Sequence, residues 1–165
     1  METYKFMEQF LLSQDVIGRI LLAAFLGSIA GIERDIHNRP AGLRTNMVIS
    51  VSSCLMTILS IDVFLPMSPE VDFTRMTAAI VSGVGFLGAG VIMHQGNGIQ
   101  GMTTAAQIWL VSGIGMAVGV GAYSLAIFTC IFTVTALIIL APLSHKFSEI
   151  GNNNNQEWSM KNGKH

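Results

Sequence analysis

This sequence carries little charge. Only 12% of its 165 residues are charged, about half the share of an average soluble domain, and the formal net charge is −1. Such a chain has no basic field to attract phosphates, so we expect no nucleic-acid partner. Cysteine is also scarce: Cys54 and Cys130 both lie in apolar runs, where a thiol is a small packing residue rather than half of a disulfide. The composition is that of a membrane protein.

What the chain does contain is long apolar runs. A helix that crosses the hydrocarbon core, about 30 Å thick, needs roughly 17–25 apolar residues. The apolar stretch 102–143 is about twice this length and breaks at Gly119 and Gly121, where glycine permits a tight turn. We therefore predict an all-α, polytopic membrane bundle of five helices within residues 16–143. The predicted spans are residues 16–32, 46–65, 76–93, 102–118 and 124–143.

Arginine and lysine predict the orientation of the bundle. Three arginines lie in the loop 33–45 and three lysines in the C-terminal segment 144–165, whereas the opposite side holds only Lys5 and Arg75. Basic residues in short loops mark the cytoplasmic side. We therefore expect an external N-terminal segment, residues 1–15, and a cytoplasmic C-terminus. The polar, asparagine-rich segment 144–165 lacks apolar periodicity and is predicted to be a disordered tail.

A polar stripe runs along the second predicted span. Its members recur every three or four positions, which places them on one face of a helix. Two interpretations stay open: helix packing through hydroxyl groups, or a water-lined cavity. The stripe consists of Asn46, Ser50, Ser53, Thr57 and Ser60.

Arg19 is an ionisable residue inside the first span. A charge at this depth is costly unless it has a partner or reaches the interface. Asp62, near the same end of the second span, and Asp15 are the available carboxylates. We expect a structural ion pair here rather than a transport role.

The densest charged cluster surrounds the first predicted cytoplasmic loop. Pro40 favours an extended conformation at Arg39, and Gly42 permits a turn before the next helix. Arginines alone would fit a positive-inside anchor, but the acidic Glu33 at the membrane boundary favours a functional site, and both interpretations stay open. The predicted cluster consists of Glu33, Arg34, Arg39, Pro40, Gly42, Arg44 and Thr45.

Small residues recur at the spacing of close helix contacts in membranes. Gly27 and Gly31 lie four positions apart in the first span, and the third span is the most glycine-rich. We predict contacts within the chain or between copies, and hence a homodimer or larger assembly. The predicted packing residues are Gly27, Gly31, Gly83, Gly85, Gly88, Gly90, Thr103, Thr104, Trp109 and Gly113.

No catalytic or metal-binding pattern emerges from the sequence. Residues 83–88 (GVGFLG) match a dinucleotide fingerprint, but they lie in an apolar helix with no preceding strand and no acidic residue where one is needed. The histidines, cysteines and carboxylates lack metal-ligand spacing, and no nucleophile has a base nearby in sequence. We expect neither a cofactor, nor a bound metal, nor an enzyme.

Three segments resemble the signatures of the MgtC/SapB family of bacterial inner-membrane proteins. Residues 31–34 (GIER) and 39–45 (RPAGLRT) are similar to the first signature, and 82–92 (SGVGFLGAGVI) to the second. Residues 101–106 (GMTTAA), followed by Trp109, are similar to the third. The segments stand in the family's order and cover most of the predicted membrane domain.

The resemblance implies a location and a biological context. Longer family members carry a cytoplasmic C-terminal domain, so we expect this chain to be the short, SapB-like form. Members of the family are linked to growth in low magnesium, to virulence inside host cells and to restraint of the F-type ATP synthase. The resemblance therefore implies a multi-pass protein of the bacterial inner membrane, with the F-type ATP synthase as a candidate partner.

Two functional hypotheses follow. The leading one is a regulator or adaptor in magnesium and ion homeostasis and stress adaptation that acts through a membrane partner. The alternative is a small ion transporter or channel, lined by the polar stripe and gated by Glu33, Arg34 and Arg44. A magnesium path usually presents carboxylates to a hydrated ion, and the sequence offers no carboxylate pair in mid-membrane, so the adaptor is preferred.

Overall fold

The computed structural model describes residues 13–67, 72, 74–95 and 98–140. In this part of the chain five helices are long and apolar enough to cross a membrane, which confirms the predicted fold class. Residues 1–12 and the predicted tail 144–165 lie outside the described residues. The five helices are α2 (Gln14–Ile36), the helical span Leu43–Met67, α5 (Thr74–Val91), α6 (Met102–Gly119) and the last helix, Tyr123–Leu140.

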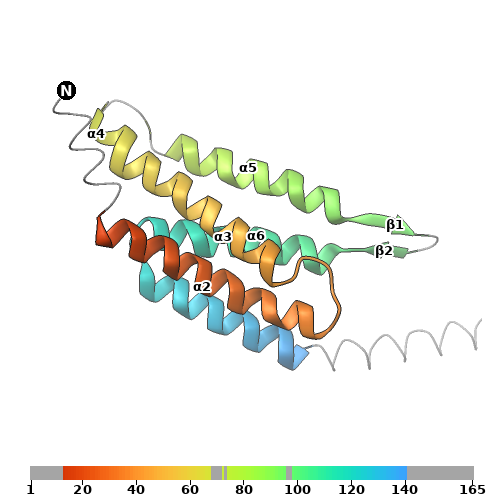
Figure 1. Cartoon of the computed structure of the whole chain (residues 1–165). Helices are drawn as coiled ribbons and strands as arrows, with labels where there is room; N and C mark the ends of the chain where they lie inside the picture. Colours follow the sequence, from red (N-terminus) through yellow and green to blue (C-terminus); the bar gives the residue numbers. More distant parts are fainter. Residues whose placement is uncertain (1–12, 68–71, 73, 96–97, 141–165) are drawn as a thin grey trace, which may run out of the picture.

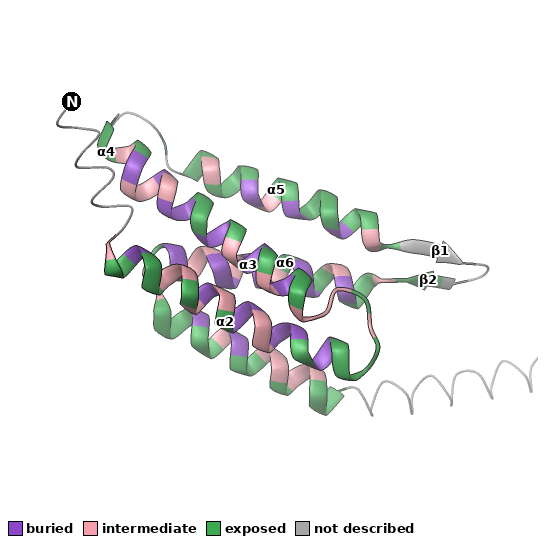
Figure 2. Cartoon of the chain, viewed as in Figure 1, coloured by how far each residue is buried: buried purple, intermediate pink, exposed green. Residues whose placement is uncertain are grey.

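The core of the bundle lies where α2, α3 (Leu43–Ile58) and α6 meet. In Figure 1, α3 runs between α2 and α5, with α6 behind it, and it contacts both α2 and α6. Half of the most apolar window of α6 is buried, against 11% for the last helix, Tyr123–Leu140. Figure 2 shows the same contrast, because buried residues follow the inner faces of α2, α3 and α6. Two peripheral helices, α5 and the last, therefore present most of their surface to the surrounding membrane.

The second span is not a uniform α-helix. After α3 it continues as a π-helical segment, η1 (Leu59–Phe64), and a short α4 (Leu65–Met67). The backbone N–H of Leu65 donates to the carbonyl of Ser60, five positions earlier, which is the π-helical pattern. The wider turn carries Asp62, so it helps to set the direction in which this carboxylate faces.

Glycine makes the turn between α6 and the last helix, as predicted. Gly121 has φ +82°, a left-handed conformation that L side chains rarely adopt. Its N–H donates to Val118 O (3.0 Å) and the N–H of Ala122 donates to Ala117 O (2.8 Å). This pair of bonds is a Schellman motif, and it satisfies carbonyls that the end of α6 would otherwise leave open.

A β-hairpin that the sequence analysis did not predict joins α5 to α6. Strand β1 (Met93–Gln95) pairs antiparallel with β2 (Gly98–Gln100), so the third span ends at Val91 and not at residue 93. Gly101 follows with φ +89°, and a Cβ there would lie 2.1 Å from the carbonyl oxygen of Val91. Only glycine allows the two helix ends to come this close.

Asp72 and Thr74 mark the opposite end of α5. The Thr74 hydroxyl (2.6 Å) and backbone N–H (2.9 Å) both donate to Asp72 Oδ1. These hydrogen bonds favour the ionised form and hold the pKa of the exposed Asp72 carboxyl below its usual range. The carboxylate thus satisfies a free N–H group in the first turn of α5.

Candidate functional site

A buried arginine organises the end of the bundle where α2 ends and α6 begins. Arg34 is only 1% exposed. Its Nε donates to Gln107 Oε1, and its Nη2 donates to the carbonyl of Thr103 (3.2 Å). The side-chain nitrogen of Gln107 then donates to Ala30 O at 2.6 Å. The network ties α2 to α6 through largely buried polar groups, whose hydrogen bonds are stronger in a medium of low dielectric constant.

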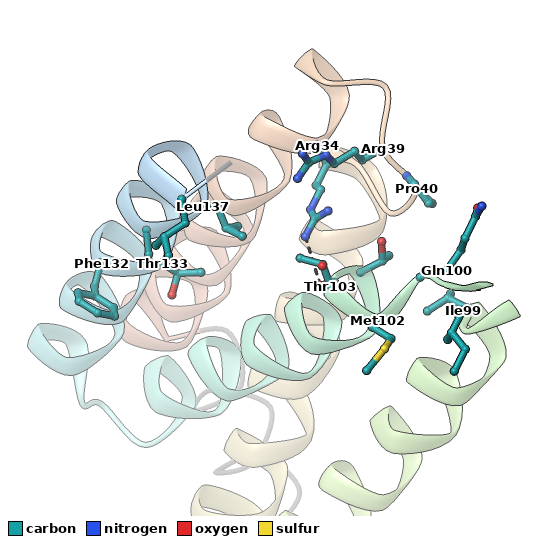
Figure 3. A pocket seen from close by; sticks show the side chains of 15 residues that line it. Arg34, Arg39, Pro40, Ile99, Gln100, Met102, Thr103, Phe132, Thr133 and Leu137 are labelled. Atoms are coloured by element: carbon teal, nitrogen blue, oxygen red, sulfur yellow. Dashed lines mark hydrogen bonds between the residues drawn. The ribbon is translucent and has the colours of Figure 1, made fainter. Parts of the chain in front are cut away.

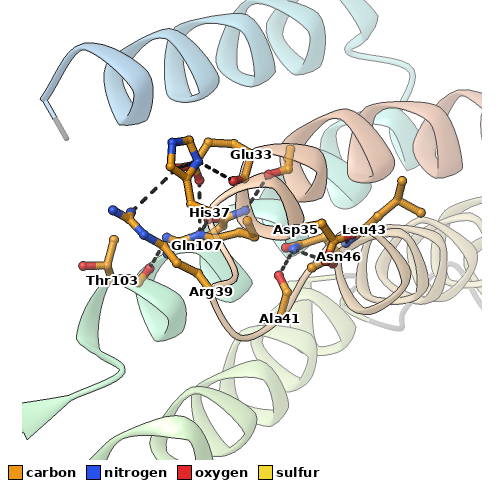
Figure 4. Close-up of polar contacts among 12 residues, drawn as sticks. Glu33, Asp35, His37, Arg39, Ala41, Leu43, Asn46, Thr103 and Gln107 are labelled. Atoms are coloured by element: carbon orange, nitrogen blue, oxygen red, sulfur yellow. Dashed lines mark hydrogen bonds and ion pairs between the residues drawn. The ribbon is translucent and has the colours of Figure 1, made fainter. Parts of the chain in front are cut away.

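Glu33 lies beside this network with three cationic or ionisable neighbours. Its side chain is 3% exposed, and its oxygens lie 3.5 Å from Arg34 Nε, 3.3 Å from His37 Nδ1 and 3.7 Å from Arg39 Nη1. Within the described part of the chain, neither carboxylate oxygen accepts a hydrogen bond. A buried carboxylate is costly unless charges compensate it, and the two arginines are the cations that face Glu33. Figure 4 shows the group, with Glu33, His37 and Arg39 gathered on one side.

Asp35 closes the loop between α2 and α3. Its Oδ2 accepts the backbone N–H of Leu43 (2.9 Å), so it caps the start of α3 from the neighbouring helix. A Cβ on Gly42 would lie 1.6 Å from Asp35 Oδ1. The left-handed residues of this loop are Asn38 (φ 51°) and Ala41 (φ 58°), and Gly42, just before α3, supplies the space that the Asp35 side chain occupies.

The loop is shorter than predicted, because α2 extends four residues beyond its predicted end and α3 begins three residues before its predicted start. Glu33 and Arg34 belong to the last turns of α2, which ends at Ile36, and Arg44 and Thr45 belong to the first turn of α3. The predicted boundaries at residues 32 and 46 are therefore wrong. Glu33 and Arg34 occupy the last turns of α2 because their side chains reach polar or charged partners at this end of the bundle.

The seven predicted cluster residues do not form one site. Arg34, Arg39 and Pro40 line a cavity of about 780 Å³ (Figure 3). Arg44 and Thr45 line a second hollow, of about 440 Å³, between α3, α5 and α6. Glu33 joins the first group through its ion pairs, and Gly42 packs against Asp35.

The polar stripe of α3 and η1 faces the interior, where helix backbones cover it. Asn46, Ser50, Ser53, Thr57 and Ser60 are all at most 6% exposed. Ser53 Oγ and Ser112 Oγ share a hydrogen bond of 2.8 Å, and the Thr57 hydroxyl donates to Ser53 O (2.8 Å). Asn46 Nδ2 donates to the carbonyls of Ala41 and Gly42 (3.0 Å to the latter).

Four glycines bring the neighbouring helices against this stripe. A Cβ on Gly27 would lie 2.7 Å from Ser50 Cβ, and one on Gly115 only 2.2 Å from Ser50 O. Gly31 meets the backbone of Leu43, and Gly119 meets Thr57. Such approaches are how helices associate where lipid supplies no hydrophobic drive, so the packing interpretation describes the stripe within one chain.

The other predicted glycines have no such contacts. A Cβ on Gly83, Gly85, Gly90 or Gly113 would meet no atom within 4 Å in the described structure, and one on Gly88 would make ordinary contact with Ala105. In the third signature, Thr104 is buried, Thr103 accepts from Arg34 through its carbonyl, and Trp109 is 56% exposed. Gly83, Gly85 and Gly90 therefore leave a part of α5 that no other described residue packs against closely.

Arg19 lies at the opposite end of the bundle and is separate from this site. Its Nη2 is 2.6 Å from Asp15 Oδ2 and its Nη1 is 3.1 Å from Asp62 Oδ2, the two carboxylates that the sequence offered. Nη1 also donates to the carbonyl of Gly119 (3.0 Å). The cation therefore binds the end of α6, where helix carbonyls favour positive charge, and its role is to join three helical segments.

Two residues of the site escaped the sequence analysis. Gln107 was missed although it is a buried amide in an otherwise apolar stretch of α6, which is a usable signal for an intramembrane partner. The sequence analysis gave His37 no role, because the histidines lack metal-ligand spacing. His37 nevertheless lies four positions after Glu33, on the same helical face. Among the residues that the structure describes, no three His, Cys, Asp or Glu side chains gather as a metal site.

Comparison with known proteins places the chain in its family. The sequence profile of the MgtC family matches residues 20–146. SapB of Bacillus subtilis is 40% identical over 131 residues, which cover 76% of this chain and 56% of SapB. MgtC of Salmonella typhimurium is 38% identical over 144 residues, covering 87% of this chain and 60% of MgtC. YhiD of Escherichia coli, whose name describes it as a candidate magnesium transporter, is 37% identical over 139 residues (82% and 65%).

Five apolar helices and these relatives define a multi-pass bacterial membrane protein. The chain belongs to the MgtC family. It spans less than two thirds of the length of the curated relatives named here. No solved structure matches it.

Proposed function

We propose that the protein is a regulator or adaptor in magnesium homeostasis and stress adaptation that acts by binding another membrane complex. The link to magnesium rests on family membership and on the name of the YhiD relative. The observation that carries the adaptor role is the burial of the α3 stripe: Gly27, Gly115 and Gly119 press helix backbones against the hydroxyls that a conducting pathway would expose to water. No enzymatic activity is part of the proposal.

The described carboxylates also support an adaptor. Glu33 pairs with arginines, Asp15 and Asp62 pair with Arg19, and Asp35 caps α3. Mg²⁺ keeps several waters and needs near-octahedral oxygen ligands, whereas each of these groups already has a cationic or backbone partner. A carboxylate held by an arginine contributes little to cation binding, because the guanidinium repels the incoming ion.

Exposed membrane-facing helices give an adaptor its contact surface. Phe86 on α5 is 80% exposed, and Gly83 and Gly85 beside it have open space where a Cβ would be. A flat glycine face lets a foreign helix approach closely. The partner we propose is an integral membrane complex, with the F-type ATP synthase as the candidate that the family resemblance supplies.

Co-purification from native membranes tests this proposal. We expect the full chain to retain F-type ATP synthase subunits in a mild detergent, and Gly85→Leu to lose them because the added side chain blocks close approach. Gly18→Leu is the matched control, since Gly18 on α2 also faces open space. Equal retention by the Gly85 and Gly18 variants would contradict a contact through α5.

One observation favours the alternative, a small ion transporter or channel. Three buried side chains at the same end, Glu33, Asn46 and Ser50, have oxygens with no hydrogen-bond partner within the described residues. Buried oxygens of this kind are usually satisfied by water or an ion. Glu33 would then lie at the mouth of a pathway along the stripe.

Flux in proteoliposomes separates the two candidates. For an adaptor we expect no Mg²⁺ flux above that of protein-free vesicles, with or without Glu33→Ala. Selective flux that Glu33→Ala abolishes, and that Asp35→Asn leaves intact, would replace the adaptor with a transporter.

A further inference from the structure

The cavity beside Arg34 lies between four parts of the chain. It has a volume of about 780 Å³, which is within the usual range of roughly 300–1,000 Å³ for small-molecule sites. Figure 3 shows the last helix with Phe132, Thr133 and Leu137 on one side, the start of α6 in the middle, and Ile99 and Gln100 of β2 opposite. Arg34 and Arg39 enter from the end of α2 and the loop that follows it.

The charge in this cavity is of one sign. Arg34 and Arg39 both line it, and none of the described residues that line it is acidic. Among the described residues, Glu33 is the one carboxylate paired with either guanidinium, at 3.5 Å from Arg34 and 3.7 Å from Arg39. Two guanidinium groups and one carboxylate leave a net charge of one positive unit. The hydrogen bonds of the buried Arg34 go to neutral groups of Gln107 and Thr103, which do not neutralise it. An anionic group would complete the neutralisation.

The chemistry of the cationic end suits a phosphate ester. A guanidinium presents a planar set of N–H donors that matches phosphate oxygens. The first turn of α6 lies on the same wall through Gly101, Met102 and Thr103, and its N-cap, Gly101, supplies no side-chain acceptor. Its backbone N–H groups add positive potential at the same place.

The other wall is apolar and faces the membrane. Phe132 and Leu140 line the cavity and are 64% and 55% exposed, and Ala136 and Leu137 lie between them on the last helix. Only 11% of that helix is buried, so this side of the cavity opens toward the surrounding lipid. A ligand here needs a charged end and a hydrocarbon part.

We propose that this cavity binds an anionic glycerophospholipid, with its phosphate at Arg34 and Arg39 and an acyl chain along the wall formed by Phe132, Ala136 and Leu140. Basic pockets between helices at a membrane surface select anionic headgroups in this way. The lipid fills the space between the last helix and α6. This site is independent of the proposed adaptor function, because it requires no protein partner.

Native mass spectrometry of the purified full chain tests the proposal. Delipidated protein is titrated with phosphatidylglycerol and, separately, with phosphatidylethanolamine. We expect at least fivefold tighter binding of phosphatidylglycerol.

We expect Arg39→Gln to weaken that binding about fivefold, the factor that corresponds to roughly 1 kcal/mol per basic residue. Arg44→Gln is the matched control: it removes the same charge at the same end, but Arg44 lines the other hollow, so binding should change less than twofold.

A second pair of variants tests the acyl wall without touching charge. Ala136→Phe fills the cavity and should reduce phosphatidylglycerol binding. Ile139 lies on the same helix, does not line the cavity and is 65% exposed, so Ile139→Phe should leave binding unchanged. Inorganic phosphate at about 10 mM, roughly the dissociation constant of a weak anion site, should leave the lipid bound. Equal binding of the two lipids, equal losses from Arg39→Gln and Arg44→Gln, or displacement by free phosphate would each overturn the proposal. Because only purified chain and lipid are present, none of these outcomes bears on the adaptor function.

Discussion

The guanidinium of Arg34 donates from Nε to the side-chain oxygen of Gln107, a residue 73 positions later in the chain. Gln107 in turn donates to Ala30 O, one helical turn before Arg34. The side-chain amide of Gln107 on α6 thus both accepts a hydrogen bond from α2 and donates one to it. Because both side chains are buried, the Nε–H of Arg34 depends on the side-chain oxygen of Gln107 for its hydrogen bond.

The Arg34–Gln107 pair predicts strong coupling between two substitutions. Gln107→Leu leaves a buried cation without its Nε acceptor and should destabilise the protein by about 1.5–3 kcal/mol, the range for hydrogen bonds to charged groups. Adding Arg34→Met removes the stranded charge and should recover part of the loss. Thermal unfolding of the four proteins in detergent measures the interaction. Additive losses would mean that the pair is not coupled.

Gly42 and Asp35 predict a second coupled pair. Gly42→Ala places a methyl group 1.6 Å from Asp35 Oδ1, so the carboxylate must move and release the N–H of Leu43. We expect a loss of about 1–3 kcal/mol, as for overpacking. In an Asp35→Ala background the same substitution should cost much less, since no oxygen is left to displace. An unchanged cost in that background would contradict the steric explanation.

Gly115 and Gly113 offer a matched test of the buried stripe. A Cβ on Gly115 would lie 2.2 Å from the backbone oxygen of Ser50, whereas one on Gly113, on the same helix, would meet no atom within 4 Å in the described structure. Gly115→Ala should therefore destabilise the bundle by about 1–3 kcal/mol, the range for overpacking. Gly113→Ala should leave the unfolding midpoint unchanged or slightly raised, because alanine favours the helix. Similar midpoints for both variants would argue against a close contact between α3 and α6.

The orientation predicted from basic residues has a direct test. Asn38→Cys and Asp72→Cys place thiols at exposed positions at opposite ends of the bundle, while the native Cys54 and Cys130 are buried. We expect a membrane-impermeant maleimide to label Asp72→Cys in intact cells, and Asn38→Cys only after the cytoplasmic face is opened. The reverse pattern would invert the topology.

We also propose a homodimer or larger assembly through α5, where a Cβ on Gly83, Gly85 or Gly90 would meet no atom within 4 Å among the described residues. Phe86→Cys should form disulfide-linked dimers in native membranes under mild oxidation. Ile139→Cys, on the exposed face of the last helix, serves as the control and should form fewer. Recovery of monomer alone from both variants would contradict an interface on α5.

Local chemistry made some features predictable from the sequence. The five spans follow from apolar length, and the turn at Gly119–Gly121 follows from the need for a left-handed residue after α6. The carboxylates available to Arg19 could be named because few charges lie near that end. The predicted helix ends near Glu33 and Thr45 were four and three residues short, and at the end of α2 the reason is that Arg34 finds polar partners on α6.

The sequence by itself determined that this chain is a membrane bundle of five helices, because each span is recognised by its own length and apolarity. Only the tertiary structure decided what the polar residues do. Arg34 meets Gln107, the stripe of α3 turns inward against Gly115, and Gly42 makes room for Asp35, since each contact joins residues on different helices. Such contacts depend on how the helices are rotated and placed against one another, and the spacing of residues along one helix does not specify which residue of another helix they meet.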